Sequence, residues 1–349
     1  MDELQSTAET CRKPEPMSNS QIEAANEVAA LDDPLLCNSD LPLSAMYYPQ
    51  GFSLEITTNS HEVLAAAEES WGKFVRVFSE PPVRLRIGAM KGDSEECSKV
   101  PVYRAWLNLL SIVGDGGNFA VSDFRRGRGF GWFTQATIEN RAYFRYYFLE
   151  ALSWMTLEPR YLTVIHAACV KLAGKTVLLC GDSGAGKSSL SLACALRGWT
   201  FLSDDSISLI RNREDRLAVG NPYSMRFREE SIELFPELKQ QRITPRATGE
   251  MAIELDTASM PEIATALTGS VDYIVFLNRQ TPGPSRLDAF PTEAALSWFK
   301  KIIFCSEKEV REAQVASLSQ LLAVPTYELC YRDLEWAVNR LDALVREGV

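Results

Sequence analysis

The chain has 349 residues, of which 46% are hydrophobic, and its formal net charge at pH 7 is −10. The apolar content is enough for the cores of two domains, whereas the negative charge argues against nucleic acid as a partner, because a phosphate backbone requires a basic surface. Eight cysteines show no Cys-x-x-Cys spacing, which indicates reduced thiols rather than disulfides or a zinc site.

The first 45 residues are rich in Glu, Ser, Asn and Pro and contain few aromatic residues. Such a segment cannot bury enough apolar area to fold, so we expect residues 1–45 to form a disordered acidic tail. The tail lacks the basic start and apolar centre of a signal peptide, and the chain has no apolar run of membrane-spanning length. We therefore expect a cytoplasmic protein that does not bind a membrane.

Residues 46–157 predict a small α+β module whose role the sequence does not reveal. Apolar residues alternate at 52–56 and at 83–87, which is typical of strands with one buried face. Between them, residues 62–74 show the spacing of an amphipathic helix.

Basic and aromatic residues gather at 125–133 and again at 141–147. Such a mixture is compatible with binding to single-stranded nucleic acid. The acidic net charge argues against that function, so we expect a glycine-rich hairpin followed by an aromatic core helix.

Residues 158–349 carry the strongest functional signal. The apolar run 177–180 predicts a strand, a Gly-x4-Gly-Lys-Ser pattern (P-loop, Walker A) follows it, and residues 190–196 show helical spacing. Glycines allow successive backbone N–H groups to turn toward a phosphate, Lys187 brings a charge to the β- and γ-phosphates, and Ser188 offers a hydroxyl to Mg²⁺. The residues expected to contact the nucleotide here are Gly181, Asp182, Ser183, Gly184, Ala185, Gly186, Lys187, Ser188 and Ser189.

A pair of aspartates follows this helix. Residues 199–203 predict a short strand that ends at Asp204 and Asp205. Two adjacent carboxylates repel each other, but they suit phosphoryl transfer, in which one can hold Mg²⁺ while the other accepts the proton of an attacking hydroxyl. Taken alone, the pair is equally compatible with a solvated turn.

Four sequence features occur close together here: GDSGAGKSS at 181–189, LRGW at 196–199, LSDDSISL at 202–209, and a His-Ala step at His166 on the preceding strand. In sequence and spacing they resemble the catalytic core of HPr kinase/phosphorylase and its HPr-kinase-like relatives. The resemblance implies an α/β fold for this domain, namely a P-loop nucleotide-binding domain with a mixed sheet of the PEP-carboxykinase/HPr-kinase type. It also implies ATP and Mg²⁺ as cofactors.

The same resemblance implies roles for single residues. Asp204 would be the general base, Asp205 would lie near the metal together with Ser188, and His166 would lie close to the acidic pair and tune it. The order of the two aspartates remains open, because either carboxylate can rotate to either task. Without the resemblance, His166 fits a core histidine on an apolar strand better. Because members of the family form hexamers, a homo-oligomer is possible.

The chain departs from the family pattern at two places. Ser189 stands where the family's protein kinases have Glu, and no Arg-Gly-x-Gly signature follows the aspartates. Residues 219–235 instead look like the corresponding segment of divergent HPr-kinase-related proteins. In this segment Arg226 and Arg228 alternate on a strand-like stretch, where they could contact phosphate from one face or could simply be exposed charges on an edge strand.

The rest of the domain is predicted from periodicity. We expect a polar, mobile loop at 239–250 near the active site, in which Arg242 and Arg246 are weaker candidates for phosphate contacts. The other predicted elements are a central strand at 271–277, helices at 292–303 and 306–322, a strand at 325–331, and a last helix that Asp333 caps and whose apolar stripe packs in the core.

These features lead us to expect an ATP- and Mg²⁺-dependent kinase that transfers the γ-phosphoryl group to a hydroxyl, with serine of a protein or peptide as the expected acceptor. Two alternatives remain. Ser189 and the missing glycine signature favour a nucleotide-binding sensor or scaffold that transfers phosphate weakly. A simple ATPase, which drives conformational work, is the third hypothesis.

Overall fold

A computed structural model describes residues 39–90, 100–245, 249–279, 283–301, 303 and 307–348. The chain divides into a unit of residues 1–39 and a second compact unit of residues 40–349. The expected disordered tail falls mainly on residues 1–38, which lie outside the described residues, and the first strand already begins at Leu43. Among the described residues, no helix has the length and apolarity needed to cross a membrane.

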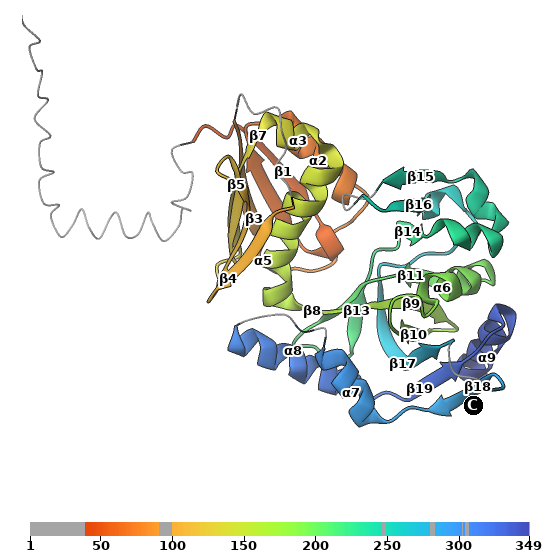
Figure 1. Ribbon diagram of the computed structural model, residues 1–349. Coiled ribbons are helices and arrows are strands. Elements are labelled where there is room, and N and C mark those ends of the chain that lie inside the picture. The colour runs from red at the N-terminus through yellow and green to blue at the C-terminus, as the bar shows by residue number, and fades with distance from the viewer. Residues whose placement is uncertain are drawn as a thin grey trace, which may run out of the picture. The chain divides into compact units, whose positions relative to one another are not determined.

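The N-terminal part of the second unit is built on a seven-stranded sheet in the order β1-β2-β3-β7-β6-β5-β4 (Figure 1). Its strands are β1 (Leu43–Tyr47), β2 (Leu54–Thr58), β3 (Val83–Met90), β4 (Val102–Trp106), β5 (Leu109–Asp115), β6 (Asn118–Asp123) and β7 (Arg128–Thr134). Its helical segments are η1 (Pro49–Gly51), α2 (His61–Trp71), α3 (Gln135–Glu139), α4 (Arg141–Phe144), the π-helical η2 (Arg145–Glu150) and α5 (Ala151–Tyr161). The two alternating strands and the amphipathic helix predicted here are therefore present as β2, β3 and α2.

Aromatic side chains fill the core between this sheet and its helices. Phe133, Phe144 and Phe148 are at most 1% exposed, and Phe133 meets the other two rings edge to face at 5.2 and 4.8 Å. The predicted hairpin and aromatic core helix are confirmed, because β6 pairs with β7 and the helical run α4–η2 carries the other two rings. Ile210 and Val219 of the next sheet join the same core.

The C-terminal part contains a nine-stranded mixed sheet. Its strands are β8 (Leu162–Ile165), β9 (Ala167–Leu172), β10 (Lys175–Cys180), β11 (Thr200–Ser203), β12 (Ile207–Ile210), β13 (Leu217–Val219), β17 (Thr268–Asn278), β18 (Arg286–Ala289) and β19 (Thr326–Cys330). The strand β17 pairs in parallel with β10 and β19 and antiparallel with β13, which confirms its predicted central place. The expected mixed α/β architecture is therefore present.

Both faces of this sheet are covered by helices. These are α6 (Lys187–Leu196) and α9 (Leu334–Glu347) on one face, and α7 (Thr292–Lys300) and α8 (Lys308–Leu321) on the other. Because side chains alternate along a strand, Val177 and Leu179 of β10 pack with α6 and α9, whereas Leu178 and Cys180 pack with α7 and α8. Leu341 on α9 is fully buried, as predicted for its apolar stripe.

A small third sheet follows, with β14 (Ser224–Phe227), β16 (Met251–Asp256) and β15 (Arg242–Pro245) in that order, and with the short turns η3 (Glu229–Glu233), η4 (Pro236–Gln240) and η5 (Thr257–Ser259). The prediction of an irregular loop over 239–250 is wrong at β15. Ile243 lies opposite Ile253 of β16, so pairing with a partner strand orders a segment that has no period of its own. Arg242 lies on this strand, and Arg246 lies outside the described residues.

Candidate phosphate site

The predicted strand–loop–helix is present at the carboxyl end of β10. The loop at 181–186 leads directly into α6. Gly184 and Gly186 have φ values of +82° and +97°, which residues other than glycine rarely adopt. A Cβ on Gly186 would lie 2.6 Å from the hydroxyl of Tyr331, whereas a Cβ on Gly184 would meet nothing within 4 Å. The loop is therefore packed on its Tyr331 side and open at Gly184.

The Lys187 ammonium lies inside this loop. Lys187 is only 6% exposed, and its Nζ donates to the carbonyl oxygens of Gly181 at 2.8 Å and Asp182 at 3.2 Å. Burial lowers the pKa of this ammonium, and the nearby carboxylate of Asp205 opposes that shift. An ammonium has three N–H donors, so one donor is left for a ligand. Ser188 and Ser189 follow on α6 and are half-buried.

Asp204 is a buried carboxylate just past the end of β11. It is 8% exposed, and its Oδ2 accepts a 2.8 Å hydrogen bond from the backbone N–H of Arg226. Burial raises the pKa of Asp204 to about 6, the hydrogen bond from Arg226 opposes the shift, and the charge of Asp205 adds to it. A general base works best when its pKa lies near the operating pH, so Asp204 is suited to accept a proton.

Asp205 points instead toward His166. Its Oδ1 lies 3.3 Å from Nδ1 of His166, and the two side chains are 57% and 42% exposed. His166 separates β8 from β9, and its neighbours Ile165 and Ala167 are fully buried. The interpretation of His166 as a core histidine is therefore wrong, and the structure places its ring beside Asp205.

Arg226 and Arg228 lie along β14 and just beyond it. Both are exposed and alternate with the buried Met225 and Phe227, so they share one face, as predicted. The guanidinium of Arg226 forms an ion pair with Glu254 at 3.0 Å, whereas Arg228 has no ion pair with a described residue. β14 is also an edge strand of its sheet, so the two arginines are exposed charges at an edge strand, and their contact with phosphate stays a prediction.

Sequence reasoning missed Arg279, which directly follows β17. Its guanidinium stacks over the ring of Tyr331 at 5.8 Å, and its Cδ lies 3.1 Å from where a Cβ on Gly186 would be. Within the described part of the chain it forms no ion pair. One signal in the sequence could have indicated Arg279, because it directly follows the apolar run predicted to be the central strand. Parallel neighbours such as β10 and β17 end at the same edge of a sheet, so a residue just after β17 lies near the loop after β10.

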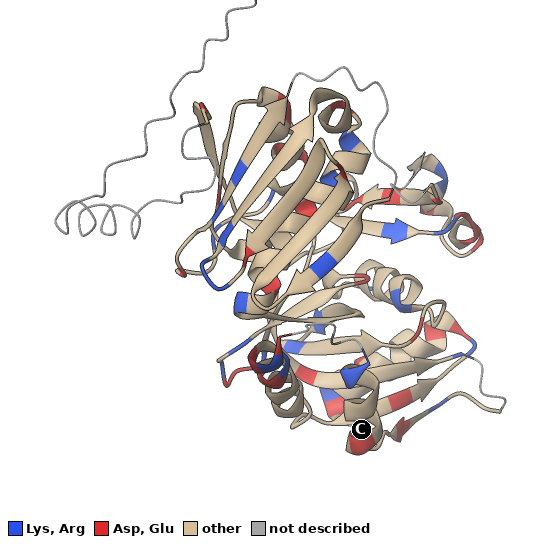
Figure 2. Cartoon of the chain, turned by 60° about the vertical axis from the view of Figure 1, so that its left-hand side comes forward, with Lys and Arg blue, Asp and Glu red and all other residues tan. Residues whose placement is uncertain are grey.

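A cavity of about 1280 Å³ brings these residues together. Of the candidate residues it is lined by His166, Ser183, Gly184, Gly186, Lys187, Ser188, Ser189, Asp204, Asp205, Arg226, Arg228 and Arg279. Gly181, Asp182 and Ala185 do not line it, and the exposed Asp182 accepts a hydrogen bond from Nε1 of Trp298 at 3.3 Å. Along the chain as a whole, acidic and basic residues are interspersed (Figure 2).

The chain is similar to known HPr kinases over a limited stretch. Residues 160–230 match the family described as the HPr Serine kinase C-terminal domain. Over 60 residues the chain is 38% identical to the HPr kinase/phosphorylase of Halalkalibacterium halodurans and 37% identical to that of Bacillus mycoides. Each comparison covers 17% of this chain and 19% of the relative, so the chain spans about a fifth of the length of the curated relatives it matches.

Among solved structures, the HPr(Ser) kinase/phosphatase from Coxiella burnetii is 16% identical, with a TM-score of 0.29, over 53% of this chain and 95% of that chain. The family match at 160–230 contains the loop, α6, both aspartates, Arg226 and Arg228. The resemblance seen in the motifs is therefore confirmed, and the chain carries, in residues 160–230, an HPr-kinase-like segment.

Proposed function

We propose that this chain is an ATP- and Mg²⁺-dependent kinase that transfers the γ-phosphoryl group to a hydroxyl, with serine of a protein or peptide as the acceptor. The observation that carries the proposal is one cavity in which the buried carboxylate of Asp204 faces the same space as Lys187 and the glycine loop. The similarity of residues 160–230 to kinases named for their action on HPr supports a phosphotransferase that acts on a protein.

The nucleotide phosphates would lie on the loop 181–186 and the start of α6. Backbone N–H groups at a helix N-terminus and in a loop with positive φ attract anions. Lys187 has one N–H donor left, and Arg279 stands beside Gly186 with its guanidinium stacked on Tyr331. Arg279 would neutralise negative charge that develops on the transferred group, as arginines do in other phosphoryl-transfer sites.

The residues present fit a magnesium ion bound together with a nucleotide. Mg²⁺ prefers oxygen ligands and is held in such sites by one or two carboxylates plus substrate phosphates. Ser188 and Asp205 line the cavity and offer a hydroxyl and a carboxylate beside the open part of the loop at Gly184. When bound there, the ion would supply charge neutralisation at the phosphates.

Asp204 would take the proton of the acceptor. As the acceptor oxygen forms its bond to the γ-phosphorus, the bond from that phosphorus to the β–γ bridging oxygen breaks and ADP leaves. The proton of the hydroxyl moves to the Asp204 carboxylate, whose pKa of about 6 leaves it mostly ionised at pH 7. His166 would hold the Asp205 carboxylate in place through the 3.3 Å contact.

Two observations favour a nucleotide sensor instead. Two of the three donors of Lys187 are taken up by carbonyl oxygens of its own loop, and Ser189 replaces the Glu expected of the family's protein kinases. A sensor would bind ATP but modify no acceptor. A simple ATPase would release phosphate without an acceptor.

Labelled ATP separates these functions. The protein is incubated with Mg²⁺, labelled ATP and a library of serine-containing peptides and hydroxyl compounds, and labelled products are separated from free phosphate. The kinase predicts a labelled acceptor, and Asp204→Asn should lower transfer by about 10²- to 10⁴-fold while ATP binding persists, because asparagine cannot accept the proton.

The matched control is Glu335→Gln, which removes an exposed carboxylate on α9 that does not line the cavity. It should transfer phosphate like the unaltered protein. Equal transfer by Asp204→Asn would eliminate Asp204 as the base, and ATP binding without any labelled acceptor would favour the sensor.

A further inference from the structure

The cavity extends well beyond the phosphate loop. Its volume of about 1280 Å³ exceeds the roughly 300–1,000 Å³ that is usual for a pocket holding one small ligand. Its far wall comes from the N-terminal part of the chain, at the end of α2 and along η2 and α5. This wall contains Glu69, Ser70, Arg145, Glu150 and Trp154.

Two contacts attach this wall to the small third sheet. Nζ of Lys73 lies 2.6 Å from Oδ2 of Asp256 on β16, and the rings of Phe74 and Tyr223 meet edge to face at 4.8 Å. β16 pairs with β14, whose Arg226 donates its backbone N–H to Asp204. The wall and the candidate base are therefore parts of one hydrogen-bonded and packed structure.

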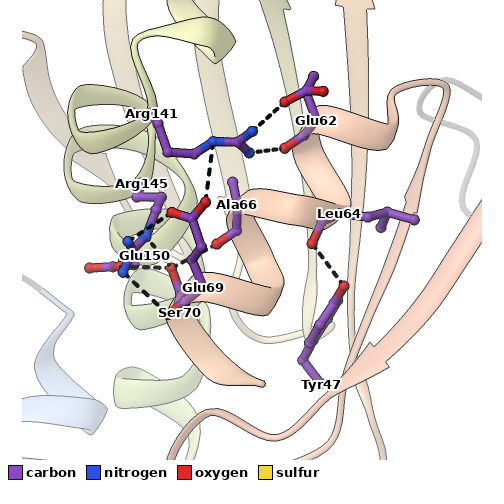
Figure 3. Close-up of polar contacts among 9 residues, drawn as sticks. All are labelled: Tyr47, Glu62, Leu64, Ala66, Glu69, Ser70, Arg141, Arg145 and Glu150. Atoms are coloured by element: carbon purple, nitrogen blue, oxygen red, sulfur yellow. Dashed lines mark hydrogen bonds and ion pairs between the residues drawn. The ribbon is translucent and has the colours of Figure 1, made fainter. Parts of the chain in front are cut away.

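A polar cluster joins α2 to η2 in this wall (Figure 3). The guanidinium of Arg145 donates to Ser70 Oγ at 2.9 Å, to Glu69 Oε2 at 3.1 Å and to Glu150 Oε1 at 3.3 Å. Ser70 Oγ in turn donates to Glu150 Oε1 at 2.7 Å, and Arg141 bonds to Glu62. Arg145 is thus occupied, whereas a carboxylate has about four lone-pair sites, so the wall offers acceptors rather than donors to a ligand.

The part of the cavity away from the phosphate loop is acidic. Six carboxylates line it: Glu69, Glu150, Glu230, Glu250, Glu254 and Asp256. Among the described lining residues four cations lie there, namely Lys73, Arg145, Arg226 and Arg228. The first three pair with Asp256, with Glu69 and Glu150, and with Glu254, so the lining keeps an excess of two carboxylates. At the other end, Lys187 and Arg279 would bind the anionic phosphates of the nucleotide. The two ends therefore suit ligands of opposite charge.

We propose that the wall formed by α2, η2 and α5 binds the phosphoryl acceptor, and that this acceptor is a hydroxyl compound that also carries a protonated amine. The amine belongs either to a free amino alcohol or to a basic residue beside a serine in a peptide. This inference rests on the proposed kinase function, which names a hydroxyl acceptor but not the charge that the acceptor carries. The N-terminal part is then a half of the site rather than a separate module.

Matched acceptors test the charge preference. Calorimetry at low salt compares 2-aminoethanol with ethylene glycol, and a Lys-Ser-Lys peptide with a Glu-Ser-Glu peptide, in the presence of Mg²⁺ and a non-hydrolysable ATP analogue. We expect each amine-bearing ligand to bind about tenfold or more tightly than its partner, which is the scale of one or two partly exposed ion pairs. Whichever of 2-aminoethanol and Lys-Ser-Lys binds more tightly shows whether the acceptor is a small molecule or a peptide.

Two variants locate the preference. Glu150→Gln should reduce it to less than about threefold, and Glu230→Gln, which leaves the Arg145 cluster intact, should also reduce it, whereas Glu335→Gln should not. Equal binding of the two members of each matched pair, or a preference unchanged in both cavity variants, would overturn the inference. Transfer of label to both kinds of acceptor would then leave the kinase standing, and selective binding of amines without any transfer would refute the kinase but keep the site.

Discussion

Burial of the Asp204 carboxylate should cost folding stability, and the cost should depend on pH. The pKa of this group is about 6 in the folded chain against an ordinary value of 3.8. Well below pH 3.8 the carboxyl is protonated in both folded and unfolded chains, so there is no charge whose burial could cost stability. As pH rises from about 4 to about 6, the unfolded chain gives up the proton more readily than the folded chain, and the free energy of unfolding falls.

The size of this effect follows from the shift. A difference of about two pKa units corresponds to about 3 kcal/mol once the pH is above both values. Asp204→Asn removes the titration while its amide oxygen can still accept from the N–H of Arg226. The variant should therefore gain about 2 kcal/mol relative to the unaltered protein between pH 4.5 and pH 7.5, although it loses transfer.

Urea unfolding of both proteins at these two pH values measures the gain, with Glu335→Gln as the control for removal of a surface carboxylate. A stability difference that does not change with pH would refute the argument, because the buried charge would then carry no cost. In the unaltered protein, transfer should fall about tenfold for each pH unit below about 6, as the base becomes protonated.

Substitutions at three further positions, with Gly174→Ala as a control, test the phosphate end of the site. Lys187→Met should weaken ATP binding by about 10- to 100-fold in calorimetry, because it removes charged hydrogen bonds; unchanged affinity would show that the ammonium stays on its own loop. Gly186→Ala should lower the free energy of unfolding by about 2–4 kcal/mol, because the residue has a positive φ and its new Cβ would clash with Tyr331. The control Gly174→Ala should lower it by only about 1–2 kcal/mol, because Gly174 has a φ of +81° but open space around it. Equal losses would mean that the clash relaxes. Arg279→Ala should lower kcat by on the order of 10²- to 10³-fold with a smaller change in KM for ATP, and Lys should restore part of it; a change in KM alone would make Arg279 a binding residue.

The local parts of the site were predictable because their signals are local. The loop, the helix after it and the end of β11 at the two aspartates follow from glycine spacing and apolar periodicity within some 30 residues. The alternation that divides β10 between two cores has the same origin. Even the shared face of Arg226 and Arg228 needed only the two-residue repeat of a strand.

The rest depends on pairings between distant segments. Arg279 reaches the loop because β17 pairs in parallel with β10, although the two are about 90 residues apart in the chain. Lys73 and Asp256, which join the far wall to the third sheet, are separated by 183 residues. His166 illustrates the same limit, because the apolar run around it predicts a buried side chain, whereas in the fold it separates β8 from β9 and its ring lies beside Asp205, which follows β11.

The strand β10 has a consequence for how this protein tolerates mutation. Its side chains alternate between two hydrophobic layers, and the phosphate loop continues directly from its last residue. A substitution that changes the packing of either layer, even on α8 or α9, should shift the strand and the loop that follows it. Core substitutions should therefore first reduce the rise in melting temperature that a nucleotide causes, before they lower the melting temperature of the protein without nucleotide.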